Sequence, residues 1–236
     1  LGGGGFAVIV TPDGGRHVLD FREVAPSAAH RDMYVEAKTE DASRVGGLAV
    51  GVPGEGPGLA ALHKRWGRLS LQQVVEPARK LATDGFEVQR HLADALAGAG
   101  PAGPKLARDL FDADEVPVRG DQVRREKLGQ TLAAFADRGA EALTSGPIAA
   151  DIATSAVSAG GVLTAEDLKR YTPKDREAVI GLYRGWTVIS MPPPSSGGVV
   201  LLQVLGALES SDLTLLGAHS AALYHRYAEA MKHGFA

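Results

Sequence analysis

The first twenty-one residues constrain the fold most strongly, because they contain two β-rich runs separated by a short turn sequence. Residues 6–10 (FAVIV) are apolar, residues 11–15 (TPDGG) are typical of a turn, and residues 16–21 form a second β-rich run. Two such runs on either side of a turn that contains glycine predict an antiparallel hairpin. The chain is therefore expected to contain an antiparallel sheet.

Helical patterns account for much of the remaining chain. Ser70 and Gln73 form a capping box ahead of apolar residues with helical spacing, and Pro77 inside that helix predicts a bend. Thr164 and Asp167 have the spacing of a second capping box. The sequence predicts helices over residues 59–66, 70–85, 128–142, 148–159 and 199–208, and from 218 onward.

Other segments are predicted to be irregular or extended. Residues 46–58 are rich in glycine and proline, so we expect a strand end and a tight loop there. Residues 99–120 lack periodicity, which suggests a surface excursion with little function. Residues 186–191 predict a strand that runs into three prolines, and the apolar residues 199–208 predict a helix buried between layers. The pattern indicates an α+β protein whose antiparallel sheet is covered by helices.

Composition excludes several classes of function. The chain has 236 residues and a net charge of −3, so it offers no broad basic field for a nucleic-acid backbone. It has no cysteine, which excludes disulfides, thiolate zinc sites, iron–sulfur clusters and a cysteine nucleophile. No apolar stretch reaches the roughly 18 residues that a transmembrane helix needs. These observations leave a globular protein of one large or two small domains.

The glycine run at residues 2–5 does not predict a nucleotide site. It lacks the Lys and Ser or Thr of a phosphate-binding loop, and it precedes a strand, whereas the dinucleotide fingerprint follows one. We expect instead that another segment or a ligand approaches this backbone too closely for a Cβ atom.

Three polar residues near the C-terminal end of the chain have the spacing of metal ligands. His225, Glu229 and His233 lie at positions i, i+4 and i+8, which places them on one helix face with a spacing compatible with a divalent ion. Three polar residues on an amphipathic helix more often form its solvated side. We therefore predict no metal ion and no other cofactor.

The serines ahead of the helix at 199–208 have two interpretations. Ser195, Ser196, Gly197 and Gly198 lie where free backbone N–H groups and the helix dipole favour an anion. Ser195 or Ser196 as a simple N-cap is the favoured alternative. No G-x-S-x-G, S-x-x-K or H-E-x-x-H motif is present, so the familiar serine hydrolase and zincin sites lack their parts.

Arg22 is the strongest single candidate for a binding residue. It lies with Glu23 at the end of the second β-rich run, and strand ends are where sites are built. A guanidinium group there offers a planar fork that can hold a carboxylate with two hydrogen bonds. The alternative interpretation is a salt bridge from Arg22 to Glu23, Asp20 or Asp32.

Five segments together resemble one known family. They are GGGGF at 2–6, LDFREVAPSAAHRDMY at 19–34, GVPGEGPG at 51–58, GGVLTAEDLKRY at 160–171 and YRGWTVISMPPPSSGG at 183–198. In order and spacing they resemble the large subunit of the γ-glutamyltranspeptidases. The resemblance covers essentially the whole chain, and DFRE-x-AP and SMPPPSSGG are its most specific motifs.

The resemblance implies an N-terminal-nucleophile hydrolase with a four-layer αββα sandwich, of which this chain supplies part. In that family a zymogen cleaves itself, and the threonine freed at the start of the small subunit attacks a γ-glutamyl amide such as that of glutathione. The resemblance gives Arg22 the role of holding the α-carboxylate of the donor. Glu23 and residues Ser195–Gly198 become possible walls of the cleft, and the expected location is periplasmic or extracellular.

The chain departs from the family pattern in what it lacks. It contains no small-subunit start and none of the small-subunit groups that complete the site, so we predict a single-domain partial large subunit over 1–236, cut at both ends and inactive without its partner. Two alternatives stay open. One is an acylase of the same scaffold that acts on glutaryl cephalosporins or an enzyme that processes poly-γ-glutamate, and the other is a non-catalytic binding or structural module.

Overall fold

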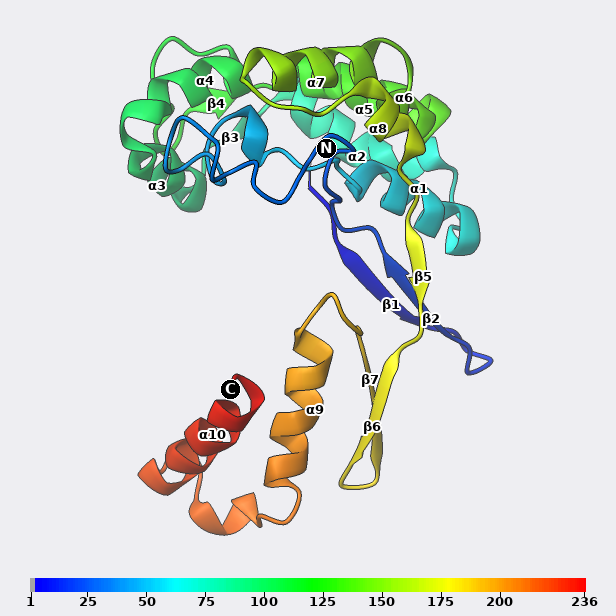
Figure 1. Ribbon diagram of the computed structural model, residues 1–236, viewed down its shortest axis with the longest axis vertical. Coiled ribbons are helices and arrows are strands. Elements are labelled where there is room, and N and C mark those ends of the chain that lie inside the picture. Colours follow the sequence, from blue (N-terminus) through cyan, green and yellow to red (C-terminus); the bar gives the residue numbers. More distant parts are fainter. Residues whose placement is uncertain (1–2) are drawn as a thin grey trace. The chain divides into compact units, whose positions relative to one another are not determined.

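The computed structural model describes residues 3–236, and Figure 1 shows its helices and strands. The chain divides into two compact units. Unit 1 comprises Gly3 and Glu23–Tyr171, and unit 2 comprises Gly4–Arg22 and Thr172–Ala236. The boundary between the units thus falls between Arg22 and Glu23. The description of the whole chain as a single partial domain stays a prediction.

The predicted hairpin is confirmed in unit 2. Strands β1 (Phe6–Val10) and β2 (Arg16–Asp20) pair antiparallel, with Val8 opposite Val18, and β5 (Lys174–Arg176) pairs with the other edge of β2. The strand β2 places Val18, Leu19 and Asp20 in the buried interior. A short turn connects β1 and β2, and β5, from far along the chain, completes the sheet.

The C-terminal part of unit 2 is a second hairpin followed by helices. Strands β6 (Val179–Tyr183) and β7 (Trp186–Ser190) pair antiparallel, and helix α9 (Gly197–Leu208) packs against both. A short 3-10 helix, η3 (Leu213–Leu216), leads to helix α10 (Ala221–Gly234), which packs on α9. The strand at 186–191 was predicted, whereas β6 was not.

Unit 1 is largely helical. Its elements are η1 (Gly47–Ala49), α1 (Glu55–Trp66), α2 (Leu71–Asp84), β3 (Phe86–Glu87), α3 (Arg90–Gly98), η2 (Gly100–Ala102), α4 (Gly103–Phe111), β4 (Gln122–Val123), α5 (Glu126–Arg138), α6 (Glu141–Thr144), α7 (Gly146–Ser158) and α8 (Ala165–Arg170). One buried cluster packs α7 and α8 around Leu163 and Leu168, and another packs α2 on α5 around Phe135. Both predicted capping boxes, at Ser70 and at Thr164, are present.

Two predictions about unit 1 are wrong. The loop predicted for residues 46–58 ends early, because α1 begins at Glu55. The carbonyl of Gly3 accepts hydrogen bonds from the N–H groups of Gly54 (2.8 Å) and Glu55 (3.0 Å), and Pro57 in the first turn needs no N–H partner. The first N–H groups of α1 are therefore satisfied by Gly3, near the start of the chain, which the local composition of residues 46–58 does not reveal.

The second error concerns residues 99–120, predicted to be an irregular excursion. They contain the nine-residue helix α4, which Pro104 opens and in which Ala107 is fully buried. A helix this short has too few turns for an apolar period to be recognised. Its stability comes from packing against α3 rather than from its own pattern.

Other helix boundaries differ from the sequence predictions. The helix predicted over 128–142 is two helices, α5 and α6, separated at Gly139, whose φ is 59°. Helix α10 begins at Ala221 rather than 218, because Ser220 accepts a hydrogen bond from the Leu223 N–H and caps it. The helix predicted to be buried between layers, α9, leaves Val199 and Leu201 exposed within this chain. No helix among the described residues is long and apolar enough to cross a membrane.

Candidate functional site

Arg22 is an exposed residue just after the end of β2 at Asp20, and it is the last residue of the first of the two segments that make up unit 2. Its main-chain N–H donates to Asp20 Oδ1 at 3.0 Å, and its guanidinium carbon lies 5.8 Å from the centre of the Phe6 ring. That distance is within the range of a cation–π contact. The Arg22 side chain therefore contacts the Phe6 ring of β1 at the protein surface.

The carboxylate of Asp20 forms its ion pair with a different arginine. Asp20 Oδ2 accepts from Arg176 Nη2 at 2.8 Å and from Arg176 Nε at 3.1 Å, across the β2–β5 ladder. Asp20 is only 6% exposed, so this two-point contact neutralises a buried charge. Asp20 was one of the alternative ion-pair partners for Arg22. It accepts a hydrogen bond from the Arg22 main-chain N–H, and its ion pair is with Arg176.

Glu23 is the first residue of the long segment of unit 1, and it lies near two glycines. A Cβ atom on Gly3 would come 3.5 Å from Glu23 Oε1, and one on Gly51 would come 3.2 Å from Glu23 Cβ. The next residue, Val24, forms a two-way backbone bridge with Val52. Glu23, an exposed residue, therefore lies beside Gly3 and Gly51.

The close approach predicted for the glycine run is confirmed at Gly5. A Cβ atom on Gly5 would lie 2.8 Å from the Phe21 ring, so the ring requires glycine there. Gly5 and Phe21 also exchange two backbone hydrogen bonds, of 3.3 and 2.9 Å. Gly2, the first residue of the predicted run, lies outside the described residues.

Ser195 caps α9, although Ser196 is the N-cap residue by position. Ser195 Oγ accepts from the Gly197 N–H at 3.2 Å, while the side chain of Ser196, the N-cap by position, forms no capping hydrogen bond. Gly198 lies against the end of β7, since a Cβ atom on it would be 2.2 Å from the Met191 carbonyl oxygen. This geometry fits the capping interpretation of Ser195.

The three polar residues of α10 do not form a cluster suited to a metal. Glu229 accepts a hydrogen bond from Lys232 Nζ at 2.6 Å, and this contact is the main reason why its pKa lies below the ordinary value. His225 and His233 are both exposed. Within residues 3–236, no group of three or more His, Cys, Asp or Glu is arranged to hold a metal ion.

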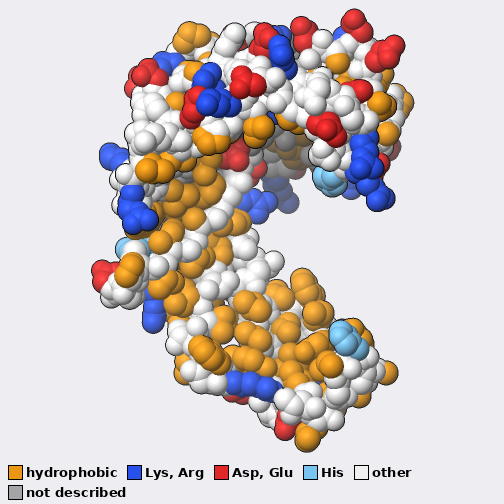
Figure 2. Space-filling view, turned by 180° about the vertical axis from the view of Figure 1, so that it is seen from behind, with side chains coloured by type: hydrophobic (Ala, Val, Ile, Leu, Met, Phe, Trp, Pro, Cys, Tyr) orange, Lys and Arg blue, Asp and Glu red, His pale blue; other side chains and the backbone are white. Residues whose placement is uncertain are grey.

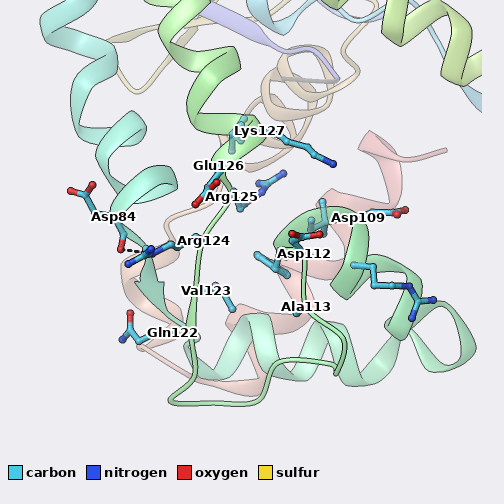
Figure 3. Close-up of a pocket in the computed structure, with 15 residues that line it drawn as sticks. Asp84, Asp109, Asp112, Ala113, Gln122, Val123, Arg124, Arg125, Glu126 and Lys127 are labelled. Atoms are coloured by element: carbon cyan, nitrogen blue, oxygen red, sulfur yellow. Dashed lines mark hydrogen bonds between the residues drawn. The ribbon is translucent and has the colours of Figure 1, made fainter.

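Unit 1 contains a cavity of about 760 Å³ that includes none of the predicted site residues. Figure 3 shows acidic and basic side chains around it, among them Asp84, Asp109, Arg125 and Lys127. Arg124 Nε donates to the main-chain oxygen of Asp84 at 3.3 Å, and Asp109 pairs with Lys105. The lining has no Ser, Thr, Cys or His, so the cavity supplies no hydroxyl, thiol or imidazole nucleophile for acyl transfer.

Comparison with known proteins identifies the family. The profile of the γ-glutamyltranspeptidases matches residues 1–236. The chain belongs to the γ-glutamyltranspeptidase family. It is 37% identical to the glutathione hydrolase proenzyme of Escherichia coli K12 over 243 residues, which is all of this chain and 42% of the proenzyme. The chain therefore spans less than half of that relative.

Solved structures of the family share the fold. The crystal structure of Helicobacter pylori γ-glutamyltranspeptidase superimposes with a TM-score of 0.91 and 36% identity, over 99% of this chain and 69% of that one. A cephalosporin acylase from Bacillus halodurans gives a TM-score of 0.86 at 27% identity, over 99% of this chain and 45% of that one. The predicted family and the α+β fold of its N-terminal-nucleophile hydrolases are thus confirmed.

Sequence analysis missed part of the hydrogen bonding of Asp167. Asp167 was assigned only to a capping box, yet it also accepts a hydrogen bond from the Ser27 N–H at 2.9 Å. Ser27 lies 140 residues earlier, in the segment that follows Glu23. The one available signal was an aspartate at the third helical position, and that signal predicts the cap alone.

Proposed function

We propose that this chain is the large-subunit part of a γ-glutamyl hydrolase or transferase that acts on glutathione-like amides together with a small subunit of the same proenzyme. The observation that carries the proposal is the family match over the whole chain. The names of the relatives, glutathione hydrolase proenzymes, support both the substrate class and the origin of the partner in one precursor.

The second hairpin supports the need for a partner. Helix α9 covers the face of β6 that carries Gly181, because a Cβ atom there would lie 2.6 Å from Leu202 Cδ2. Successive side chains of a strand point to opposite faces, so Ile180 and Leu182 lie on the other face, where they are 47% and 76% exposed. Strands that are apolar on both faces are normally covered on both sides.

Figure 2 shows how apolar side chains gather on the surface of the C-terminal part of unit 2. Exposed apolar residues of β6, β7 and α9 are Ile180, Leu182, Trp186, Val199 and Leu201. Of these, Ile180 and Leu182 lie on the face of β6 opposite α9. We assign the small subunit to this face, where its strands would complete the inner layers of the αββα sandwich.

In the proposed reaction, a threonine at the start of the small subunit attacks the γ-glutamyl amide and forms an acyl-enzyme. Water or an acceptor amine then releases the glutamyl group. Arg22 holds the α-carboxylate of the donor through a charge-assisted contact, and this contact orients the amide for attack. The exposure of Arg22 at the surface of unit 2 supports this role.

The test is the substitution Arg22→Ala in the full proenzyme, matured to two subunits. Loss of a charge-assisted contact costs on the order of 2 to 3 kcal/mol, so kcat/KM for a γ-glutamyl anilide is expected to fall about thirtyfold to a hundredfold. Arg16→Ala, an exposed arginine at the start of the same strand, is the matched control and is expected to keep kcat/KM within about twofold. Unchanged efficiency in Arg22→Ala would remove this residue from the site.

A side-by-side assay separates the proposal from the acylase alternative. A glutaryl anilide lacks the α-amine of the γ-glutamyl donor, so a γ-glutamyl enzyme is expected to hydrolyse it far more slowly. Intact-mass analysis of the native protein tests the binding-module alternative, because a catalytic pair requires a second polypeptide that begins with threonine. A preparation without that second chain and without turnover would support the module.

A further inference from the structure

Strand β2 ends in a buried carboxylate whose two oxygens have different partners. Asp20 is 6% exposed. Its Oδ2 accepts from Arg176 Nη2 at 2.8 Å and from Arg176 Nε at 3.1 Å. Its Oδ1 accepts from the main-chain N–H of Arg22 at 3.0 Å. The two-point contact with Arg176 therefore orients the carboxylate, and the other oxygen holds the backbone two residues further along the chain.

The contact between Asp20 and Arg22 lies where the sheet ends. On one side of β2, Phe21 exchanges two main-chain hydrogen bonds with Gly5, of 2.9 and 3.3 Å. On the other side, β5 begins at Lys174, which lies opposite Asp20, so the β2–β5 ladder does not extend to Arg22. The Asp20 side chain therefore supplies an acceptor for the Arg22 N–H at the point where the strand pairing stops.

The register of the sheet brings Arg176 to this carboxylate. Val18 lies opposite Arg176 in the β2–β5 pair, and Asp20 follows Val18 by two residues. Side chains two residues apart lie on the same face of a strand, and a long side chain can reach its diagonal neighbour across an antiparallel pair. On the other edge of β2, Phe6 lies opposite Asp20, and its ring contacts the Arg22 guanidinium. Both neighbouring strands thus contribute to the surroundings of Arg22.

We propose that Asp20, oriented by Arg176, is a positioning residue for Arg22 in the binding of the donor carboxylate. Neither Asp20 nor Arg176 has to touch the substrate in this role. Asp20 holds the main chain from which the Arg22 side chain extends, and the strength of a charge-assisted hydrogen bond depends steeply on its geometry. The inference rests on the proposed function, and it adds to the site a residue that lies 156 positions after Asp20.

The test uses two donors that differ only in the carboxylate. A γ-glutamyl anilide carries the α-amine and the α-carboxylate, whereas a γ-aminobutyryl anilide carries the same amine and the same scissile amide without the carboxylate. A residue that acts on the carboxylate through Arg22 changes kcat/KM for the first donor alone. Loss of folded enzyme lowers kcat/KM for both donors by one factor. The donor ratio, defined as kcat/KM for the first donor divided by that for the second, therefore reports the carboxylate contact.

Four variants of the matured two-subunit enzyme are compared with the unmodified one. Arg22→Ala gives the donor ratio that remains when the contact is lost. Arg176→Ala is expected to lower kcat/KM for the γ-glutamyl anilide about tenfold, mainly through KM, and to change it for the γ-aminobutyryl anilide less than about twofold. Lys174→Ala removes an exposed positive charge from the same strand, opposite Asp20, and is the matched control. It should leave the donor ratio within about twofold.

The fourth variant, Arg22→Ala combined with Arg176→Ala, shows whether Arg176 acts through Arg22. If it does, the second substitution lowers the donor ratio no further, because the group that Arg176 positions is already absent. A further fall of about tenfold in the combined variant would mean that Arg176 acts on the donor independently of Arg22, and the positioning role would be refuted.

An unchanged donor ratio in Arg176→Ala would also overturn the inference, whether both efficiencies fall equally or neither falls. If Arg176→Ala does not mature, Arg176→Lys decides in its place, since it keeps a positive charge but loses the two-point contact, and it should lower the donor ratio about threefold. Failure of the proposed function gives a different result. The unmodified enzyme would then not turn over the γ-glutamyl anilide, or Arg22→Ala would keep the donor ratio.

Discussion

The two buried carboxylates of the described residues, Asp20 and Asp167, are stabilised in different ways. In unit 2, Asp20 meets the guanidinium of Arg176 in a two-point ion pair. In unit 1, the donors that Asp167 meets are neutral: the N–H groups and the hydroxyl groups of Ser27 and Thr164. The ion pair of Asp20 links two charged side chains across a sheet. The neutral donors of Asp167 belong to two chain segments, so this one carboxylate holds both segments.

The difference bears on function. Asp20, paired with Arg176, also accepts a hydrogen bond from the Arg22 main-chain N–H. Asp167 holds Ser27, in the segment that follows Arg22 in the sequence. Each carboxylate therefore contacts backbone in or next to the segment that contains Arg22, the residue proposed to hold the donor.

The largest expected effect comes from breaking the ion pair. Asp20→Ala leaves Arg176, whose side chain is 36% exposed, without its partner, and because removal of one partner of a buried pair costs about 3 kcal/mol, a loss of up to that size is expected. The midpoint of urea unfolding measures this loss. Asp20→Asn should lose less, since an amide oxygen still accepts from Arg176. Equal midpoints for Asp20→Ala and the unmodified protein would show that the pair contributes nothing.

Asp167→Asn is expected to cost somewhat less, about 2 kcal/mol, because a hydrogen-bonded buried charge is replaced by an amide that cannot satisfy both donors. The effect should depend on pH. The pKa of Asp167 is lower in the folded protein than its ordinary value of 3.8, so its stabilisation is complete above about pH 4 and is lost as the pH falls toward 2. Unfolding midpoints of the variant and the unmodified protein should therefore converge at pH 2. A constant difference from pH 7 to pH 2 would argue against the ionised carboxylate as the cause.

Thr164→Ala sharpens the comparison, since it removes one neutral donor and retains the charge. Loss of an N-cap hydroxyl typically costs about 1 kcal/mol. The melting temperature should fall by less than in Asp167→Asn. A larger fall would mean that the cap, and not the carboxylate, dominates the stability of this region.

The smallest effect is expected at the surface. Glu229→Gln removes the contact with Lys232 on α10, where solvent and salt screen the charges. No measurable change in the urea midpoint is expected at physiological salt. A loss comparable to that of Asp20→Ala would contradict the distinction drawn between buried and exposed charges.

Local signals in the sequence predicted much of the fold. The turn TPDGG between two β-rich runs predicted the β1–β2 hairpin, and the capping boxes at Ser70 and Thr164 predicted where two helices begin. The errors occurred where distant residues decide local structure. Helix α1 begins inside a glycine- and proline-rich stretch because the Gly3 carbonyl caps it, and α4 forms because Ala107 is buried.

The candidate site shows the same division. The sequence by itself placed Arg22 at a strand end and, through its motifs, in the γ-glutamyltranspeptidase family, because turns, caps and motifs are encoded over a few residues. Only the tertiary structure decided that Arg176, 156 residues away, takes the carboxylate of Asp20, and that Asp167, 140 residues away, holds Ser27. Such contacts depend on how β5 and α8 pack, and packing is set by burial over the whole unit rather than by any local pattern.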